Sequence, residues 1–371
     1  MVAPGESMST RHRTPKATES VSHAPVARLR DVATAADVDP STVSRVLRGD
    51  PTQGVRPETR DRIIEAAREL RYRPHAVARS LRTRQTDTFG LLVPTLDNIG
   101  FSEVVHGIQA AAAEAGKLVM VVEVRAVDSA GARADLDELY ARLVLDGRVD
   151  GLIVGFATAD DPLVKSLAER RLPLVLVNRR SSGIHGSVVV DDRRGAVLAV
   201  EHLISLGHRN IGYVGFAPKT DTSRRRFEGY RSAMGKAGLP IDERWLASGD
   251  PTEEGGQQAV AQILSASGRQ RPTAIFSSTL LGAFGILAGL LDAGHSVPDA
   301  VSVVAFNDHP IAAITAPPLT TVKMPNFEMG RRAMHMLIRA TVGHPVTDEM
   351  LKDPPELIVR ASTAAHRKTR R

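Results

Sequence analysis

From Phe89 onward, apolar runs of strand length alternate with helical patterns over most of the 371-residue chain. The runs, such as GLLVP (90–94) and LPLVLVN (172–178), are continuously apolar, which is typical of strands buried on both faces. Strands of this kind, each followed by a helix, predict parallel sheets covered by helices on both sides. One series of these units ends near Asn178, and a second starts with NIGYVGF (210–216). We therefore predict two similar α/β lobes, each built on a doubly wound parallel sheet.

The loops that follow these strands predict where a ligand binds, since ligands of open parallel sheets lie beyond the carboxyl ends of the strands. A small molecule is therefore expected in a cleft between the lobes. The chain has no GxGxxG after the first strand and no GxxxxGK[ST], which disfavours nucleotide-dependent enzymes. The loops concerned are Pro94–Phe101, Asn178–Arg180, Pro218–Arg226, Ser278–Leu280 and Asn307–His309.

Composition excludes several classes of site. The chain has no cysteine, so disulfides, thiol catalysis and zinc–thiolate sites are excluded. The stretch Pro272–Leu291 carries no charge and is long enough to span a bilayer. It also contains glycine, serine and threonine, and a short strand followed by a helix buried on all sides explains it better. The first 26 residues lack an apolar run, so we expect a cytoplasmic protein with a disordered N-terminal arm and no membrane span.

The charge is unevenly distributed along the chain. Residues 26–85 contain 13 arginines against 8 acidic residues, and the tail from residue 361 is also basic. The body between them is net acidic, because the whole chain carries only +6. This distribution indicates a polyanion-binding module joined to a second domain.

The stretch DVATAADVDPSTVSRVL, Asp31 to Leu47, contains two short apolar patterns separated by a polar kink. Asp37 suits a left-handed turn, Asp39 suits a helix N-cap, and Pro40 suits the first helical position. These features predict a helix–turn–helix. Its two helices are expected to pack through Val32, Ala33, Ala36, Val43, Val46 and Leu47.

The second helix then presents Ser41, Thr42, Ser44 and Arg45 outward. This face is either an ordinary solvated surface or one that reads DNA, because helix–turn–helix proteins offer this part of the second helix to base edges. Arg45 can donate two hydrogen bonds to a guanine, whereas Thr42 and Ser44 suit phosphates.

A third helix is predicted over Pro57–Tyr72. Its apolar stripe of Ile63, Ala67 and Leu70 is expected to face the other two helices. Arg60, near the start of this helix, is placed to contact a phosphate.

An ordered set of motifs resembles the LacI/GalR family of bacterial transcriptional regulators. The motifs are LRDVATAADVDPSTVSRVLRG, VRPETRDRIIEAARELRYRPHAVARSL, VVVDDRRGAVLAVEHLISLGHRNIGYVG, RRRFEGYRSAM and PPLTTV, and the resemblance covers Leu29 to Arg360. It implies a helix–turn–helix DNA-binding domain with a hinge helix, followed by a two-lobed α/β domain like a periplasmic binding protein. It also implies a dimeric repressor of a pseudo-palindromic operator, controlled by a small effector and needing no cofactor.

The resemblance divides the chain into five segments. They are a disordered arm (1–26), the helix–turn–helix domain (27–73), the hinge helix and linker (74–86), the effector-binding and dimerisation domain (87–360) and a basic tail (361–371). Lobe 1 is expected over about 87–186 and 323–344, and lobe 2 over about 187–322 and 345–360.

The segment RPHAVARSL, Arg73 to Leu81, resembles the family's hinge helix. Leu81 matches the leucine that wedges between base pairs in the minor groove, and Ala78 matches the small residue before it. His75 stands where the family usually has Asn, and either side chain can donate to a phosphate. Because a single short helix is marginal in water, this one is expected to form only on DNA, paired with its dimer mate. The alternative is that Leu81 is a linker residue packed on a lobe.

The resemblance also assigns residues to the effector. Arg226 matches an arginine that grips the ligand, and Asn307 and Asp308 match an acidic loop that assists it. Such an arginine can pair with a neighbouring carboxylate and with ligand hydroxyls. Asn178 occupies the position of another ligand contact. A lobe-surface ion pair is the alternative role for Arg226.

Two loops make the effector class uncertain. Asp97 and Phe101 follow the first strand, where a carboxylate and a ring can frame a sugar-like molecule. Thr279 and Leu280 stand where the family usually carries Asn-Asp. This departure favours a less polar or differently shaped effector, or a ligand response that is altered or lost.

Two questions of assembly and class stay open at this stage. The helix Leu281–Leu291 is apolar nearly all round, which fits the family's dimer interface or burial inside the monomer. A small-molecule-binding protein with only non-specific DNA affinity is the alternative function. An enzyme is disfavoured because no histidine has a serine or carboxylate at a persuasive spacing; the candidates are His106, His202, His208, His295 and His309.

Overall fold

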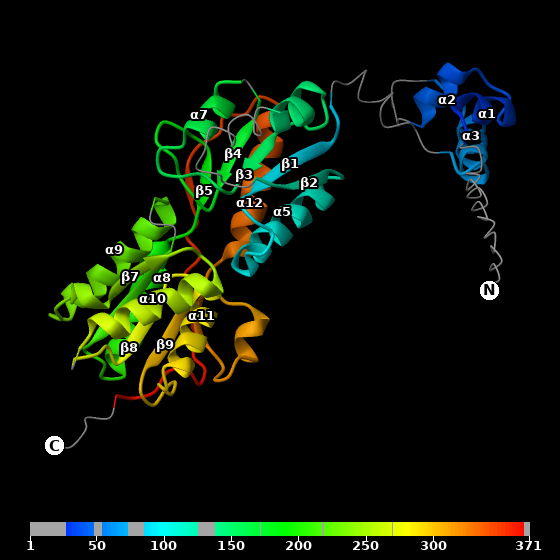
Figure 1. Ribbon diagram of the computed structural model, residues 1–371. Helices are drawn as coiled ribbons and strands as arrows, with labels where there is room; N and C mark the ends of the chain where they lie inside the picture. The colour runs from blue at the N-terminus through cyan, green and yellow to red at the C-terminus, as the bar shows by residue number, and fades with distance from the viewer. Residues whose placement is uncertain are drawn as a thin grey trace, which may run out of the picture. The chain divides into compact units, whose positions relative to one another are not determined.

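The computed structural model describes residues 27–47, 54–72, 85–124, 138–170, 172–216, 219–268 and 270–366. The chain divides into two units, one ending at Arg82 and one starting at Thr83 (Figure 1). His75, Ala78 and Leu81 lie outside the described residues, as do the expected hinge helix and N-terminal arm.

The first unit is built from three helices, α1 (Leu29–Ala35), α2 (Pro40–Val46) and α3 (Pro57–Glu69). Their apolar faces meet in one core, which confirms the predicted helix–turn–helix and its third helix. The fully or nearly buried members of this core are Val32, Ala33, Ala36, Val43, Ile63, Ala66 and Ala67.

Leu70 was expected in this core and does not belong to it. Helix α3 ends at Glu69, so Leu70 is the C-cap and its side chain is 37% exposed. Ala66, one turn earlier, is buried in its place.

The second unit contains two six-stranded sheets within its described residues. All neighbouring strands are parallel except β10 and β12, which confirms the predicted pair of parallel sheets. The sheet of lobe 1 has the order β11-β5-β4-β3-β1-β2, and its strands are Glu349–Met350, Ser187–Val189, Leu174–Val177, Leu152–Val154, Thr88–Val93 and Leu118–Glu123. The sheet of lobe 2 has the order β12-β10-β9-β8-β6-β7, and its strands are Glu356–Ile358, Thr320–Lys323, Ser302–Phe306, Ala274–Ser277, Ile211–Phe216 and Leu246–Gly249.

Helices cover both faces of each sheet (Figure 1). Lobe 1 carries α5 (Ser102–Glu114), α7 (Pro162–Ala168) and α12 (Asn326–Thr341). Lobe 2 carries α8 (Asp192–Ser205), α9 (Asp221–Lys236), α10 (Glu253–Ala266) and α11 (Leu280–Asp292). Short 3-10 or π turns lie at Ile99–Phe101, Ala141–Leu145, Glu243–Trp245 and Pro310–Ala313.

The expected boundaries of lobe 2, at 187 and 345, are wrong by a few residues. β5 pairs with β4 and β11 pairs with β5, so Ser187–Val189 and Glu349–Met350 extend the sheet of lobe 1. The chain crosses into lobe 2 only at the start of α8, after the buried run Val188–Val190 has completed the first sheet.

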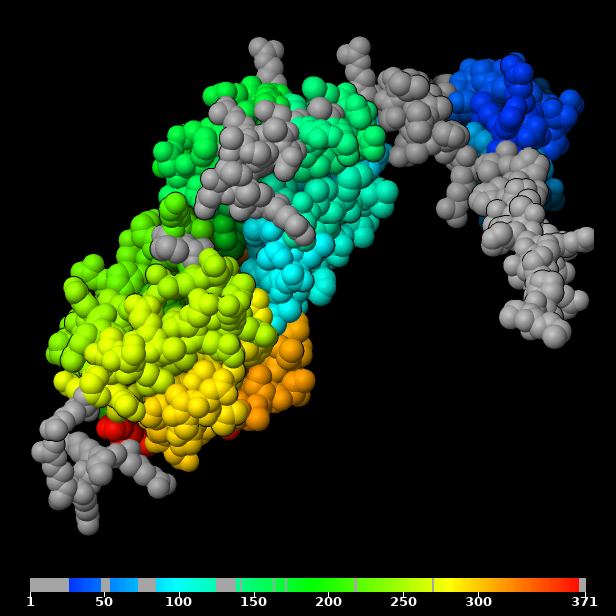
Figure 2. Space-filling view, in the orientation of Figure 1, coloured from blue at the N-terminus to red at the C-terminus, as the bar shows by residue number. Residues whose placement is uncertain are grey.

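The uncharged stretch Pro272–Leu291 forms β8 and most of α11. The expectation that this helix is buried on all sides is wrong, because Leu291 is 75% exposed and Phe284 and Leu287 are only half-buried. Figure 2 shows the yellow segment that contains α10 and α11 at the surface of lobe 2. In the part of the chain that the structure describes, no helix has the length and apolar character needed to cross a bilayer.

Candidate functional site

The turn between α1 and α2 has the predicted chemistry. Asp37 adopts a left-handed conformation, with φ of 48°. The Asp39 carboxylate accepts a hydrogen bond of 2.7 Å from the backbone N–H of Ser41, and Pro40 opens the helix. Hydrogen bonding from Ser41 lowers the pKa of Asp39, so this N-cap is ionised at neutral pH. The start of α2 is therefore fixed.

The outward face of α2 is defined by its one fully buried residue, Val43. At 100° per residue, Ser41, Thr42, Ser44 and Arg45 all lie on the half of the helix opposite Val43. Ser41 and Arg45 are exposed, and Thr42 and Ser44 are half-buried. The Arg45 side chain folds back along the helix, where Nε donates to the carbonyl of Ser41 at 3.2 Å and Nη2 to the Thr42 hydroxyl at 3.4 Å. These are long, exposed contacts that a base edge can replace.

Helix α3 supplies two further arginines. Arg60 is exposed on the first turn of the helix, where the sequence placed a phosphate contact. Arg62 has a structural role that the sequence did not reveal, since its Nε donates to the carbonyl of Ala36 at 2.8 Å. This bond fastens α3 to the C-terminal end of α1.

The second candidate site lies in the second unit, where the carboxyl ends of strands from both lobes meet. Lobe 1 contributes Asn178 after β4, and lobe 2 contributes the start of α8, the first turns of α9 and the residues after β8 and β9. Asn178 and Asn307 both have positive φ, 69° and 70°. Both strands are therefore followed by a residue in the left-handed region, a conformation that asparagine tolerates better than most residues.

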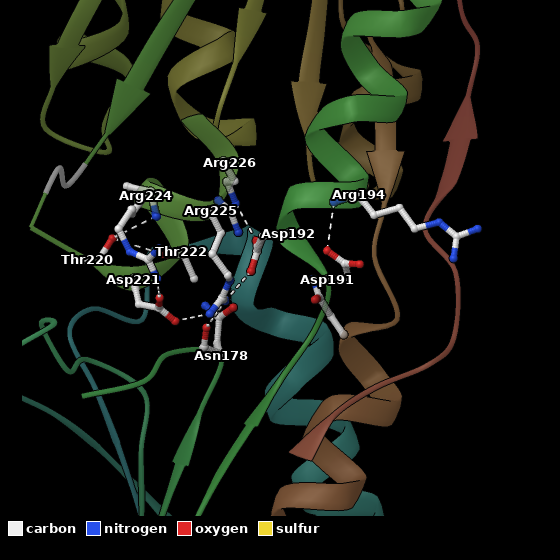
Figure 3. Close-up of polar contacts among 12 residues, drawn as sticks. Asn178, Asp191, Asp192, Arg194, Thr220, Asp221, Thr222, Arg224, Arg225 and Arg226 are labelled. Atoms are coloured by element: carbon white, nitrogen blue, oxygen red, sulfur yellow. Dashed lines mark hydrogen bonds and ion pairs between the residues drawn. The ribbon is translucent and has the colours of Figure 1, made fainter. Parts of the chain in front are cut away.

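Asp192 is the centre of a buried ion-pair network at this place (Figure 3). Its carboxylate is fully buried and accepts from Nε of Arg226 at 2.7 Å and from Nη2 of Arg225 at 2.5 Å. Arg225 also pairs with Asp221. Both arginines are less than 10% exposed, so water does not solvate these charges, and the opposite charges stabilise one another instead.

Arg226 is held on three sides. Its Nε donates to Asp192, and its Nη1 donates to the carbonyl of Ser278 at 2.7 Å. Its guanidinium carbon lies 4.0 Å from the centroid of the Phe306 ring. Among the described residues, none accepts a hydrogen bond from Nη2 of Arg226. One donor of a fixed guanidinium is therefore available to a ligand.

Arg179, which is half-buried, adds a further guanidinium next to this network. Its Nη1 donates to the carbonyl of Phe156 at 3.0 Å. Burial, and next the nearby charge of Arg226, lowers the pKa of Arg179 to about 10, so this side chain remains charged at neutral pH. Asp161 and Asp192 partly offset this effect.

Several of these contacts join the two lobes. Nη2 of Arg225, on α9 of lobe 2, donates to the carbonyl of Asn178 in lobe 1 at 3.3 Å. The amide of Asn326, at the start of α12, donates to the side-chain oxygen of Asn307 at 3.2 Å. A Cβ placed on Gly100 would lie 3.0 Å from Nδ2 of Asn307, so the loops after β1 and β9 also approach each other. A ligand in this region would contact both lobes at once.

The structure brings some of the predicted effector residues together and separates others. Asn178, Arg226 and Asn307 lie around the buried network, and the ring of Phe101 covers Gly155 in lobe 1. Asp97 is exposed and bonds within its own loop to Thr95.

The carboxylate partner of Arg226 is Asp192 and not Asp308. Asp308 pairs with Arg360 at 2.8 Å and accepts from the Thr321 hydroxyl at 2.5 Å, whereas Arg226 uses Asp192. Thr279 is the N-cap of α11, and its hydroxyl accepts from the N–H of Gly282 at 3.2 Å. A hydroxyl so placed fixes the start of a helix.

Sequence reasoning missed the residues that hold this site together, namely Asp192, Asp221, Arg225 and Arg179. Asp192 and Arg225 lie in two of the quoted motifs, VVVDDRRGA and RRRFEGY, whereas Asp221 lies in neither, and adjacent charges in one motif do not reveal which of them is buried. No group of histidine and carboxylate side chains within the described ranges is arranged to hold a metal ion.

The two units together define a class of protein: a DNA-binding regulator that joins a helix–turn–helix to a two-lobed small-molecule-binding domain. Comparison with family models identifies residues 28–75 as "Bacterial regulatory proteins, lacI family" and residues 200–363 as a periplasmic binding protein-like domain. The chain is 31% identical to catabolite control protein A of Priestia megaterium over 338 residues, which cover 90% of this chain and 98% of that protein.

Solved structures agree with this comparison. The lac repressor dimer bound to operator and the anti-inducer ONPF matches with a TM-score of 0.78 and 27% identity, over 92% of this chain and all of that one. The complex of the transcriptional regulator CelR with cellobiose matches with a TM-score of 0.68 and 29% identity, over 91% and 99% of the two chains. The chain belongs to the lacI family of bacterial regulatory proteins, which confirms the resemblance found in its sequence.

Proposed function

We propose that this transcriptional regulator represses its target by binding a pseudo-palindromic operator as a homodimer, and that a small effector bound between the lobes changes its DNA affinity. The observation that carries the DNA-binding part is the outward face of α2. A capped helix that exposes Ser41 and Arg45, with its only fully buried side chain on the opposite face, is built to present polar groups to a groove. In this proposal Arg45 reads a base, Thr42 and Ser44 contact phosphates, and Arg60 contacts the flanking backbone.

Arg226 supports the effector part of the proposal. Its guanidinium is fixed by Asp192, the Ser278 carbonyl and the Phe306 ring, and retains one unpaired donor. A ligand with hydroxyl or carbonyl acceptors would take this donor without a cost for ordering the side chain. Asn178 and Asn307 flank it and can donate or accept. This donor set fits a polar metabolite such as a sugar, and cellobiose in the related CelR structure agrees with that class.

Contacts between the lobes suggest how an effector acts. The link from Arg225 to the carbonyl of Asn178 is a single 3.3 Å bond, and a ligand that binds nearby would strengthen or replace it. The relative closure of the lobes would then shift, and with it the balance between DNA-competent and incompetent states.

The dimer is proposed to form through α11. Leu291 on this helix is 75% exposed, and Phe284 and Leu287 of the same helix are half-buried. A stripe of large apolar side chains on one helix is best covered by the same stripe of a second copy, because a two-fold axis makes such a patch complementary to itself.

Selection from a random pool of double-stranded DNA tests the proposal. The full-length protein is used at near-physiological salt, because non-specific binding weakens steeply as salt rises. Arg45→Ala and Leu81→Ala are compared with Arg68→Ala, which removes an arginine from an exposed face of α3 where it pairs only with Glu65.

The expected result is enrichment of one short palindrome by the wild-type protein and by Arg68→Ala, but not by the other two variants. No enriched motif for the wild-type protein would favour a small-molecule-binding protein with non-specific DNA affinity. Enrichment that survives Arg45→Ala would contradict the role given to this arginine.

The effector claim has its own test. Affinity for the selected operator is measured in the presence of a panel of mono- and disaccharides, for the wild-type protein and for Arg226→Lys and Asp308→Asn. A sugar that changes operator affinity should lose its effect in Arg226→Lys, since lysine cannot reproduce the fork of donors. Asp308→Asn should retain the response, because Asp308 is engaged with Arg360 and Thr321.

A further inference from the structure

A cavity lies at the edge of lobe 2, and Ala159 of lobe 1 also lines it. Its volume is about 580 Å³, within the range of small-molecule sites, and it lies between α9, the edge strand β7 and the end of β6. Figure 1 shows α9 and β7 at the same side of this lobe. None of the residues assigned to the effector lines the cavity.

Helix α9 separates this cavity from the ion-pair network. Thr220, Ser223, Arg224 and Phe227 line the cavity and follow the spacing of one helical face. Arg226, on another face, carries the network around Asp192. The two sites therefore use different faces of one helix.

The walls of the cavity are largely apolar and aromatic. Phe216, Phe227, Leu246 and the ring of Tyr213 line it, and the rings of Tyr213 and Phe227 lie 5.2 Å apart. Phe227 and Leu246 are only half-buried. Such walls suit a flat ring system.

One buried polar group lies at the cavity. Tyr213 is 5% exposed, and its hydroxyl faces the side chain of Ser278. Burial raises the pKa of Tyr213 to about 12, so the hydroxyl is a neutral donor. A Cβ placed on Gly215, which also lines the cavity, would lie 2.9 Å from the ring of Tyr213, so the glycine makes room for that ring.

The charges at the cavity have one sign. Lys219 and Arg224 line it, and none of its lining residues is acidic. Arg224 is already paired with Asp221 and Glu228, at 2.7 and 2.8 Å. Lys219 is exposed and pairs with no carboxylate among the described residues. An anionic group on a ligand would be attracted to this lysine.

We propose that this cavity is a second small-molecule site, which takes an aromatic ring system carrying a carboxylate or sulfonate. The ring lies between Phe227, Leu246 and Tyr213, and the anion faces Lys219. The site is independent of the effector site proposed above.

Titration of the full-length protein with anilinonaphthalene sulfonate tests this site, with probe fluorescence as the readout. Ser248 lines the cavity from the exposed face of β7, so Ser248→Phe places a ring in it. Ser265→Phe is the matched control, because Ser265 is exposed on α10 and does not line the cavity. Gln262→Phe, on the exposed surface of α10 at the opposite rim, is the second filling variant in case Ser248→Phe folds poorly.

Each result either supports or overturns the assignment. We expect one saturable site whose Kd rises at least about tenfold in Ser248→Phe and Gln262→Phe and is unchanged in Ser265→Phe. Lys219→Gln should weaken binding about fivefold, as loss of one partly exposed ion pair does, while Lys352→Gln has no effect. Naphthoate should displace the probe more effectively than neutral naphthalene methanol. Absence of saturable binding, or binding indifferent to both filling variants, would overturn the site, and equal displacement by the neutral compound would overturn its preference for anions.

Discussion

Replacing Asp192 by asparagine should destabilise the second unit without changing its shape. Asn has nearly the volume of Asp, so packing is retained while the negative charge is lost. Arg226 then has no carboxylate partner, and Arg225 keeps only Asp221. Both guanidinium groups stay buried and charged.

The magnitude follows from the burial of all three side chains. Asp192 is 0% exposed, and Arg225 and Arg226 are 6% and 7% exposed. Removing one partner of a buried ion pair costs about 3–5 kcal/mol, because the remaining charge is left without solvation. Asparagine retains one acceptor oxygen, so we expect a loss near the lower end, about 3 kcal/mol.

Urea unfolding followed by the fluorescence of Trp245 measures this loss. Trp245 is the only tryptophan of the chain and is 3% exposed in lobe 2, so its signal reports the second unit alone. Glu201→Gln is the control, since Glu201 forms an exposed pair with Lys236 whose loss should cost less than about 1 kcal/mol. If Asp192→Asn costs no more than Glu201→Gln, the network does not stabilise the second unit and the reasoning fails.

Three other outcomes follow from the structure. Ile63→Ala should abolish operator binding and leave Trp245 fluorescence unchanged. Ile63 is 0% exposed in a three-helix core, and its truncation costs about 2–5 kcal/mol. The neighbouring Ile64 is 42% exposed, so Ile64→Ala should be tolerated in the same binding assay. Leu291→Glu should convert the dimer into a monomer in analytical ultracentrifugation, and a dimer that persists would move the interface away from α11. Burial lowers the pKa of His208, so the unfolded state takes up a proton first as pH falls. The free energy of unfolding should therefore be level above about pH 7 and decrease below about pH 6.5, and a urea midpoint that rises on acidification would contradict this.

Much of the fold could be predicted from the sequence, for identifiable reasons. The continuous apolar runs of β1, β4, β6 and β9 are buried on both faces, as runs of that type require. The start of α2 follows from Asp39 and Pro40, whose chemistry acts within a few residues.

What could not be predicted depends on contacts between distant segments. The motif RRRFEGY shows three adjacent arginines, but only the crossing from β5 to α8 decides that Asp192 binds two of them. Asp308 was assigned to the effector from the family resemblance, and nothing in the sequence shows that Arg360, 52 residues later, pairs with it. The exposed stripe of α11 likewise depends on which sides α10 and the sheet already cover.

The ratio of two dissociation constants tests the central claim most directly. Binding of the full-length protein to its selected palindrome is compared with binding to a scrambled duplex of equal length and composition, at near-physiological salt. The account predicts a ratio of about 10³ or more, which Arg45→Ala reduces sharply while Arg68→Ala leaves it intact. Equal affinity for the two duplexes would contradict a sequence-specific regulator.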